Sequence, residues 1–61
     1  MAPDEVYAVL VSAGFQVAIA EDTFIVSLIT RTISIAEVEA ALNYPANVTY
    51  QSVGGVVIVR C

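Results

Sequence analysis

Six carboxylates are the residues of this sequence best suited to chemistry, as acids, bases or metal ligands. They are Asp4, Glu5, Glu21, Asp22, Glu37 and Glu39. The sequence contains no histidine, which excludes histidine-based catalysis and histidine metal sites. A carboxylate acts as a general acid or base near neutral pH when an apolar pocket raises its pKa, and the pattern implies no such pocket. We therefore expect a protein that is not an enzyme and that binds no metal or cofactor.

Four of these carboxylates are expected to gather at one end of the fold. They are Asp4, Glu5, Glu21 and Asp22. If the first helix runs antiparallel to the first strand, the start of the helix and the turn after the strand share one pole. Such a group would suit a basic partner or hold a cation weakly. The simpler interpretation is that Asp4 and Glu5 complement the helix dipole and that Glu21-Asp22 is an ordinary polar turn.

The other reactive groups carry no signature of a site. Gly54-Gly55 lacks the spacing and the lysine of a phosphate-binding loop, and a hairpin turn explains it better. The single cysteine, Cys61, cannot form a disulfide within the chain. We interpret Cys61 as a small apolar residue that ends a buried strand register, with an intermolecular disulfide as the alternative.

The composition is apolar and sparsely charged. Hydrophobic residues make up 59% of the chain and charged residues 13%, with a formal net charge of −4. The cations are Arg31 and Arg60, and because a phosphate backbone is bound by several cations, we expect no direct nucleic-acid binding. No run reaches the roughly 18 apolar residues of a membrane span, and no basic segment precedes the first apolar run. We expect no membrane binding and a cytoplasmic location in a host cell.

The first half of the chain has the pattern of a helix followed by a hairpin. Residues 3–14 show helical spacing, with a proline at the start and a glycine at the end. The apolar face of this helix comprises Val6, Val9, Leu10 and Ala13. Residues 15–20 and 24–30 then form strands around Glu21-Asp22. A two-residue loop pairs Ile19 with Phe24 and keeps the large apolar residues on one face, as would a four-residue loop.

The second half repeats this order with clearer end signals. Ser34 and Glu37 match a capping box, and Ile33 and Val38 match the hydrophobic staple around it. The inward-facing residues of this helix are Ile35, Val38, Ala41 and Leu42. Asn43 can end the helix. Residues 47–53 and 56–61 then pair across the glycines, with Val53 opposite Val56 and Tyr50 opposite Val59.

The element order is therefore α-β-β-α-β-β, with matching apolar positions in the two halves. Val6 and Val38 are 32 residues apart, and Val17 and Tyr50 are 33 apart. We interpret this match as a structural pseudo-repeat, with convergence of pattern as the alternative. We predict one α+β domain over residues 1–61, a four-stranded antiparallel sheet of order 3-4-2-1 with both helices on one face. This connectivity resembles a circularly permuted ferredoxin-like fold, a likeness of topology that implies no function.

The sheet face turned away from the helices is expected to be partly apolar. Its polar residues are Gln16, Ser27, Thr49, Gln51 and Arg60. Its candidate interaction residues are Ile25, Ile29, Val53, Val56 and Ile58. With the second and fourth strands in the centre, these residues would form a patch of the kind that marks a binding surface. The alternative is that β-branched residues simply favour strands.

These features favour a non-catalytic subunit that packs into a larger assembly, with a protein partner or as a homo-oligomer. A low charge and a sheet that is apolar on both faces fit a permanent interface, and a small phage or virion component is our preferred example. The second hypothesis is a small acidic inhibitor that blocks a host enzyme by an anti-defence or nucleic-acid-mimic mechanism. Six acids are few for a mimic, which ranks it lower. A small-molecule-binding regulatory domain ranks third because no polar residues converge.

Overall fold

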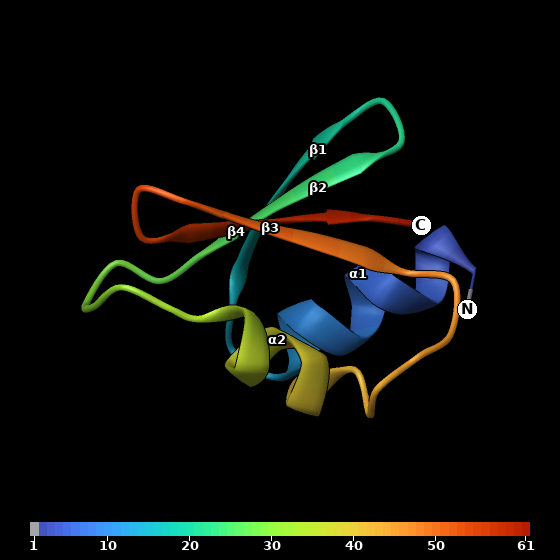
Figure 1. Ribbon diagram of the computed structural model, residues 1–61, viewed down its shortest axis with the longest axis horizontal. Coiled ribbons are helices and arrows are strands. Elements are labelled where there is room, and N and C mark those ends of the chain that lie inside the picture. The colour runs from blue at the N-terminus through green and yellow to red at the C-terminus, as the bar shows by residue number, and fades with distance from the viewer. Residues whose placement is uncertain (1) are drawn as a thin grey trace.

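A computed structural model describes residues 2–61 and has the predicted element order (Figure 1). The helices are α1 (Pro3–Ser12) and α2 (Ile35–Ala41). The strands are β1 (Gln16–Ala20), β2 (Thr23–Ser27), β3 (Thr49–Val53) and β4 (Val56–Arg60). The protein is a small α+β domain, in which each helix is followed by a hairpin.

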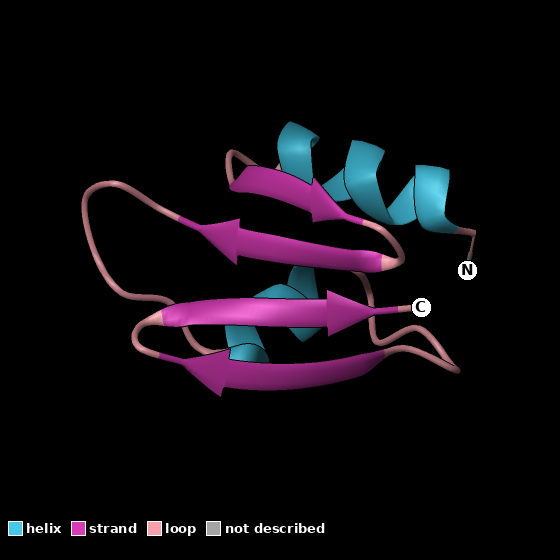
Figure 2. Cartoon of the chain, turned by 90° about the horizontal axis from the view of Figure 1, so that it is seen from above, coloured by secondary structure: helices cyan, strands magenta, loops and turns pink. Residues whose placement is uncertain are grey.

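The strands form one four-stranded antiparallel sheet of spatial order β1-β2-β4-β3 (Figure 2). This order confirms the predicted 3-4-2-1 arrangement. The predicted hairpin registers are also confirmed, since Ile19 lies opposite Phe24 and Tyr50 lies opposite Val59. The central strands β2 and β4 pair with Ile25 opposite Ile58. Both loops therefore hold two residues, which keeps the large apolar residues of each hairpin on one face.

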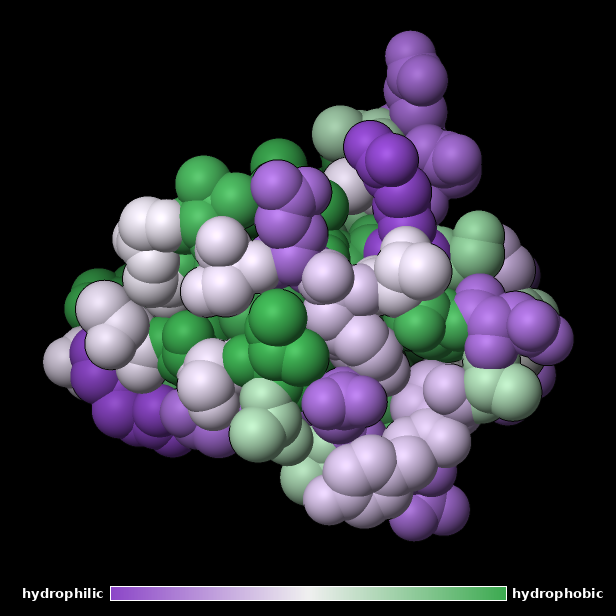
Figure 3. Space-filling view, in the orientation of Figure 1, coloured by the Kyte–Doolittle hydropathy of each residue, from purple (hydrophilic) through white to green (hydrophobic). Residues whose placement is uncertain are grey.

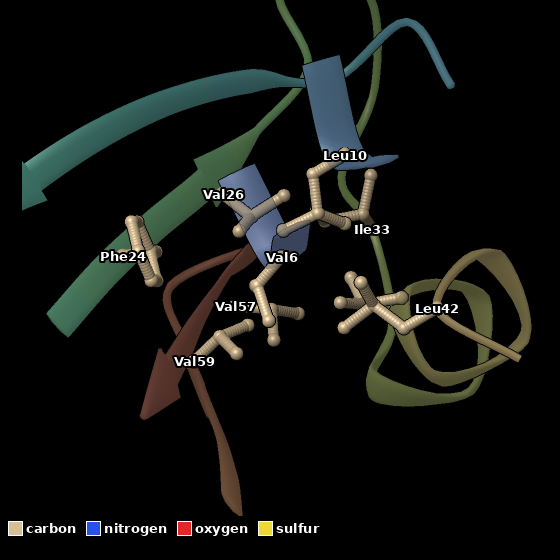
Figure 4. Packing of buried hydrophobic residues seen from close by; sticks show 9 residues of the cluster. Val6, Leu10, Phe24, Val26, Ile33, Leu42, Val57 and Val59 are labelled. Atoms are coloured by element: carbon tan, nitrogen blue, oxygen red, sulfur yellow. The ribbon is translucent and has the colours of Figure 1, made fainter. Parts of the chain in front are cut away.

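The hydrophobic core lies between this face of the sheet and both helices. Its buried residues are Val6, Leu10, Phe24, Val26, Ile33, Val38, Leu42, Val57 and Val59. In Figure 4 the labelled side chains from α1, β2, β4 and the α2 region point toward one another. Because strand side chains alternate between faces, only alternate residues of β2 and β4 contribute. The two helices thus cover one side of the sheet, as predicted.

Both helices end with the same backbone motif. After α1, the Gly14 N–H donates to the Val11 carbonyl and the Phe15 N–H donates to the Leu10 carbonyl. After α2, Asn43 and Tyr44 donate in the same way to Ala40 and Glu39. This is the Schellman arrangement, in which a residue at positive φ satisfies the last carbonyls of the helix. Gly14 and Asn43 hold that position, with φ of 95° and 61°.

Several predictions about element ends were wrong. β1 begins at Gln16 and β3 at Thr49, both later than predicted. α1 stops at Ser12, so Ala13 caps the helix and is exposed instead of facing the core. β2 stops at Ser27, so Ile29 lies in the following loop and not on a central strand. Neither neighbour of β2 offers a partner beyond Ser27, because β1 begins at Gln16 and β4 at Val56. Cys61 follows the last residue of β4 and is exposed, so it does not extend the buried register.

The β3–β4 turn is packed against the loop that precedes α2. The Ile33 N–H donates to the Gly55 carbonyl across 3.1 Å. Gly54 and Gly55 have φ of 55° and 84°, the pattern of a type I′ turn. A Cβ at Gly55 would lie 2.6 Å from Cγ2 of Thr32, whereas a Cβ at Gly54 would meet nothing within 4 Å.

We predict that Gly55→Ala destabilises the fold more than Gly54→Ala. Both changes force an L-residue to positive φ, at about 1–2 kcal/mol. Gly55→Ala adds the collision with Thr32, a further ~1–3 kcal/mol of the kind seen on overpacking. Urea unfolding of both variants measures the difference, and Thr32→Ser should recover part of the loss in Gly55→Ala alone. Equal losses in the two variants would show that the contact with Thr32 does not constrain the turn.

Candidate functional site

The sheet face opposite the helices carries an apolar cluster, which we name the outer patch. It comprises Ile25, Ile58, Val56 and Val53. Ile25 is 37% exposed and Val53 is 45% exposed, while Ile58 and Val56 are half-buried. Figure 3 shows hydrophobic surface at the upper left, on the side of the sheet away from the helices. Four of the five predicted interaction residues are thus neighbours on one face.

Strand pairing makes the outer patch continuous. Ile25 lies directly opposite Ile58, and Val56 lies directly opposite Val53. Ile58 and Val56 are two apart on β4 and share its outward face. The fifth predicted residue, Ile29, is 82% exposed in the loop beyond β2 and does not belong to the sheet face. Ile29 could add to a contact made by the outer patch only at its border, where β2 ends.

A polar row borders the outer patch at its other end. Thr23 and Thr49 both lie opposite Arg60. The Arg60 Nε–H donates to Thr23 Oγ1 across 3.3 Å, and the Thr23 hydroxyl donates to Asp22 Oδ1 across 3.2 Å. These contacts join the β1–β2 turn to the C-terminal strand. The apolar surface therefore has a polar rim on the side nearest the two chain ends.

An open hollow of about 290 Å³ lies between the outer patch and this rim. It is lined by Thr49, Tyr50, Gln51, Ile58 and Arg60. Apart from Ile58, none of these residues was predicted as a site. The sequence pattern could have identified three of them, because Thr49, Gln51 and Arg60 share the predicted outward register with Ile58. The hollow therefore combines an apolar side chain, Ile58, with the guanidinium of Arg60 and the polar side chains of Thr49 and Gln51.

The four carboxylates predicted to gather do lie on elements at one end of the molecule. Figures 1 and 2 show the start of α1 and the β1–β2 turn on the same side of the molecule. Asp4 and Glu5 belong to the first turn of α1, and Glu21 and Asp22 form the β1–β2 turn. Hydrophilic surface covers the tip of that hairpin in Figure 3. Within residues 2–61, no group of three or more acidic or cysteine side chains is placed to hold a metal ion. Contact with a basic partner stays a prediction.

An ion pair lies at the start of α2. Arg31 Nη2 lies 2.7 Å from Glu37 Oε2, and Arg31 Nη1 donates to Oε1 across 2.9 Å. The same carboxylate accepts from the Ser34 N–H, and the Ser34 hydroxyl accepts from the Glu37 N–H, which confirms the capping box. The hydrogen bond from Arg31 is the largest cause that lowers the pKa of Glu37. Arg31 thereby helps to fix Glu37 at the start of α2.

Tyr50 carries a buried polar atom without a partner. Within the described chain, its hydroxyl oxygen is shielded from solvent and has no hydrogen bond. Burial raises the pKa of Tyr50, and the nearby charges of Glu39 and Cys61 raise it further. A buried hydroxyl without a hydrogen-bond partner costs stability.

Comparisons of the chain with protein-family models, with curated proteins and with solved structures give no significant match. No helix within residues 2–61 is long and apolar enough to cross a membrane.

Tyr50→Phe is expected to raise the free energy of unfolding by about 1 kcal/mol, because it removes a buried hydroxyl that has no partner. Tyr44→Phe is the control, since Tyr44 is exposed and the same change there should have no effect. Thermal and urea unfolding of both variants check this. A loss of stability in Tyr50→Phe would mean that the hydroxyl makes a bond.

The ion pair predicts a defined response to acid. Because the folded pKa of Glu37 lies below its unfolded value, the stabilisation is complete above the ordinary glutamate pKa of about 4.3. It is lost as the pH falls through the folded pKa. The difference in the free energy of unfolding between wild type and Glu37→Gln should be constant near neutral pH. It should shrink toward zero as the pH falls into the acid range. In an Arg31→Met background, the pH dependence contributed by Glu37 should shrink; an unchanged dependence would contradict the assignment.

Proposed function

We propose that this protein is a non-catalytic assembly subunit that binds a protein partner or another copy through the outer patch. The observation that carries the proposal is that the two central strands present Ile25, Ile58 and Val56 on the face that no helix covers. On a chain this small, an apolar centre in an uncovered sheet gains most from being shielded by a second surface.

The charge distribution supports a dry contact at this face. Arg60 is the one charged residue at an outward-facing strand position, and it stands at the rim. The centre of the outer patch has no group whose desolvation would oppose burial. A protein interface with an apolar centre and a polar border has the same layout. We propose that one side chain of the partner binds in the hollow beside Ile58.

The proposal extends to the origin of the fold and its setting. We propose that residues 3–27 and 35–60 are two copies of one αββ unit, arranged as a permuted ferredoxin-like topology. The supporting observations are that the edge strands β1 and β3 start 33 residues apart, as do β2 and β4, and that both helices close with the same motif. As a setting we propose a phage or virion assembly in the host cytoplasm, where small subunits act by packing alone.

Ile25→Asp is expected to abolish association through the outer patch and leave the fold intact. A buried carboxylate without a partner opposes burial strongly, whereas Ile25 is exposed enough to tolerate charge in the free chain. Sedimentation at low and high salt measures association, because an apolar contact should persist in salt. Circular dichroism reports the fold.

Tyr44→Asp is the matched control, since it introduces the same charge at an exposed apolar residue outside the outer patch. It should sediment as wild type does. The proposal fails if Ile25→Asp associates as strongly as wild type and retains the partners that wild type captures from its native source. Unfolding of Ile25→Asp would place Ile25 in the core instead.

A further inference from the structure

We propose that a second copy of this chain pairs with the exposed edge of β1, so that two sheets join into one antiparallel sheet of eight strands. The surface involved is distinct from the outer patch. It consists of the free edge of β1 and the exposed apolar residues of α1 beside it. Its central residues are Tyr7, Val11, Val17, Ala18 and Ile19.

The edge of β1 has none of the features that prevent strands from adding. Its sequence, Gln16–Ala20, contains no charge, no proline and no glycine, and it pairs with β2 without a bulge. Edge strands usually carry such features because their free N–H and C=O groups attract other strands. Four of its five residues are exposed and Val17 is half-buried. Most side chains of this edge are therefore accessible.

The hairpin register identifies which backbone groups are free. A two-residue loop makes Ala20 and Thr23 a hydrogen-bonded pair. Hydrogen-bonded and non-hydrogen-bonded pairs alternate along antiparallel strands, so Ala18 and Gln16 also bond to β2. Val17 and Ile19 therefore direct their N–H and C=O groups away from the sheet. These are two donors and two acceptors aligned for a new strand.

The same register makes β1 complementary to itself. Antiparallel pairing of two copies about Ala18 sets Val17 of each copy opposite Ile19 of the other. Val17 and Ile19 then form hydrogen-bonded pairs in both directions, and Ala18 meets its own copy at a non-hydrogen-bonded position. Cα atoms approach to about 4.5 Å at such positions, which favours a small residue. This is an isologous contact, closed by one two-fold axis.

Apolar side chains on the helix side of the edge would be covered by the same contact. Ile19 is 60% exposed although it points toward the helix layer, and Tyr7 and Val11 are exposed on α1. α1 packs along β1 on that side of the sheet (Figure 2). The Tyr7 ring lies 6.4 Å from the ring of Phe24, which pairs with Ile19. Pairing the two β1 edges would bring Tyr7, Val11 and Ile19 of one copy close to the same residues of the other, on the helix side of the joined sheet.

The antiparallel register keeps the acidic groups of the two copies apart. Each chain has a net charge of −4, with Glu21 and Asp22 directly after β1. Antiparallel pairing about Ala18 puts these turns at opposite ends of the joined strands. Glu21 of one copy then lies opposite the uncharged Phe15 of the other. The acidic groups are kept apart while the neutral edges meet.

The opposite edge of the sheet is a poorer site. β3 presents Tyr50 and Ser52 at the positions that Val17 and Ile19 hold on β1. Glu39 lies near enough to Tyr50 to act on it electrostatically. None of the exposed large apolar residues belongs to α2. Pairing two copies at β3 would cover no exposed large apolar residue of α2.

Ile19→Lys tests the inference, with Ser52→Lys as the matched control on the other edge. In the Ile25→Asp background, where contact through the outer patch is removed, sedimentation and light scattering should give twice the 6.4 kDa mass of the chain. Ile19→Lys should halve that mass, because the ammonium would be buried against Val17 of the other copy. Ser52→Lys should leave it unchanged. Ile25→Asp should retain the β1 dimer, which separates this inference from the role of the outer patch.

Amide hydrogen exchange gives a second readout that does not depend on a variant folding. In wild type, the Val17 and Ile19 amides should exchange more slowly as protein concentration rises, while the Ser52 amide should not change. A chain that is monomeric at every concentration overturns the inference and leaves the edge to a strand of another protein. An Ile19→Lys dimer, or Val17 and Ile19 exchange that ignores concentration, overturns it as well.

Discussion

Both helices of this chain pack on the same face of a four-stranded sheet, and the rest of the structure follows from that arrangement. Every buried apolar residue lies on the helix side or in the loop that leads into α2. The outward positions of the central strands must then be occupied by something, and the chain places isoleucine and valine there. The stability of the domain comes from the inner layer, and the binding that we propose involves the outer layer and the β1 edge.

The inner layer is held by short connections as well as by packing. Both hairpins turn in two residues, and both helices end in the same hydrogen-bonded motif, so little chain is left unconstrained. The Gly55–Ile33 hydrogen bond ties the second hairpin to the entry of α2. Arg31 and Ser34 fix Glu37 at that same entry. One region near the β3–β4 turn thus carries three separate constraints, while the β1 edge carries few.

This imbalance between the two edges has a physical consequence. The β3 side is bounded by a carboxylate and by polar strand residues, whereas the β1 side exposes apolar residues from a strand and a helix. A surface that is both unprotected and apolar gains free energy when it is covered. The outer patch and the β1 edge lie on different sides of the molecule. The two contacts that we propose would therefore not compete for the same surface.

The sequence by itself determined the elements, the hairpin registers and the division of residues between the two faces of the sheet. These depend on local spacing: a two-residue turn, a capping box and an alternation of period two leave few other pairings for residues such as Ile19 and Phe24. The outer patch could be predicted for the same reason, apart from Ile29. The tertiary structure alone decided where elements stop and which groups are exposed. β2 ends when its neighbours do, and Tyr50 loses its hydroxyl partner only once the layers pack. Such features depend on contacts between residues far apart in the chain, and a local pattern contains no information about them.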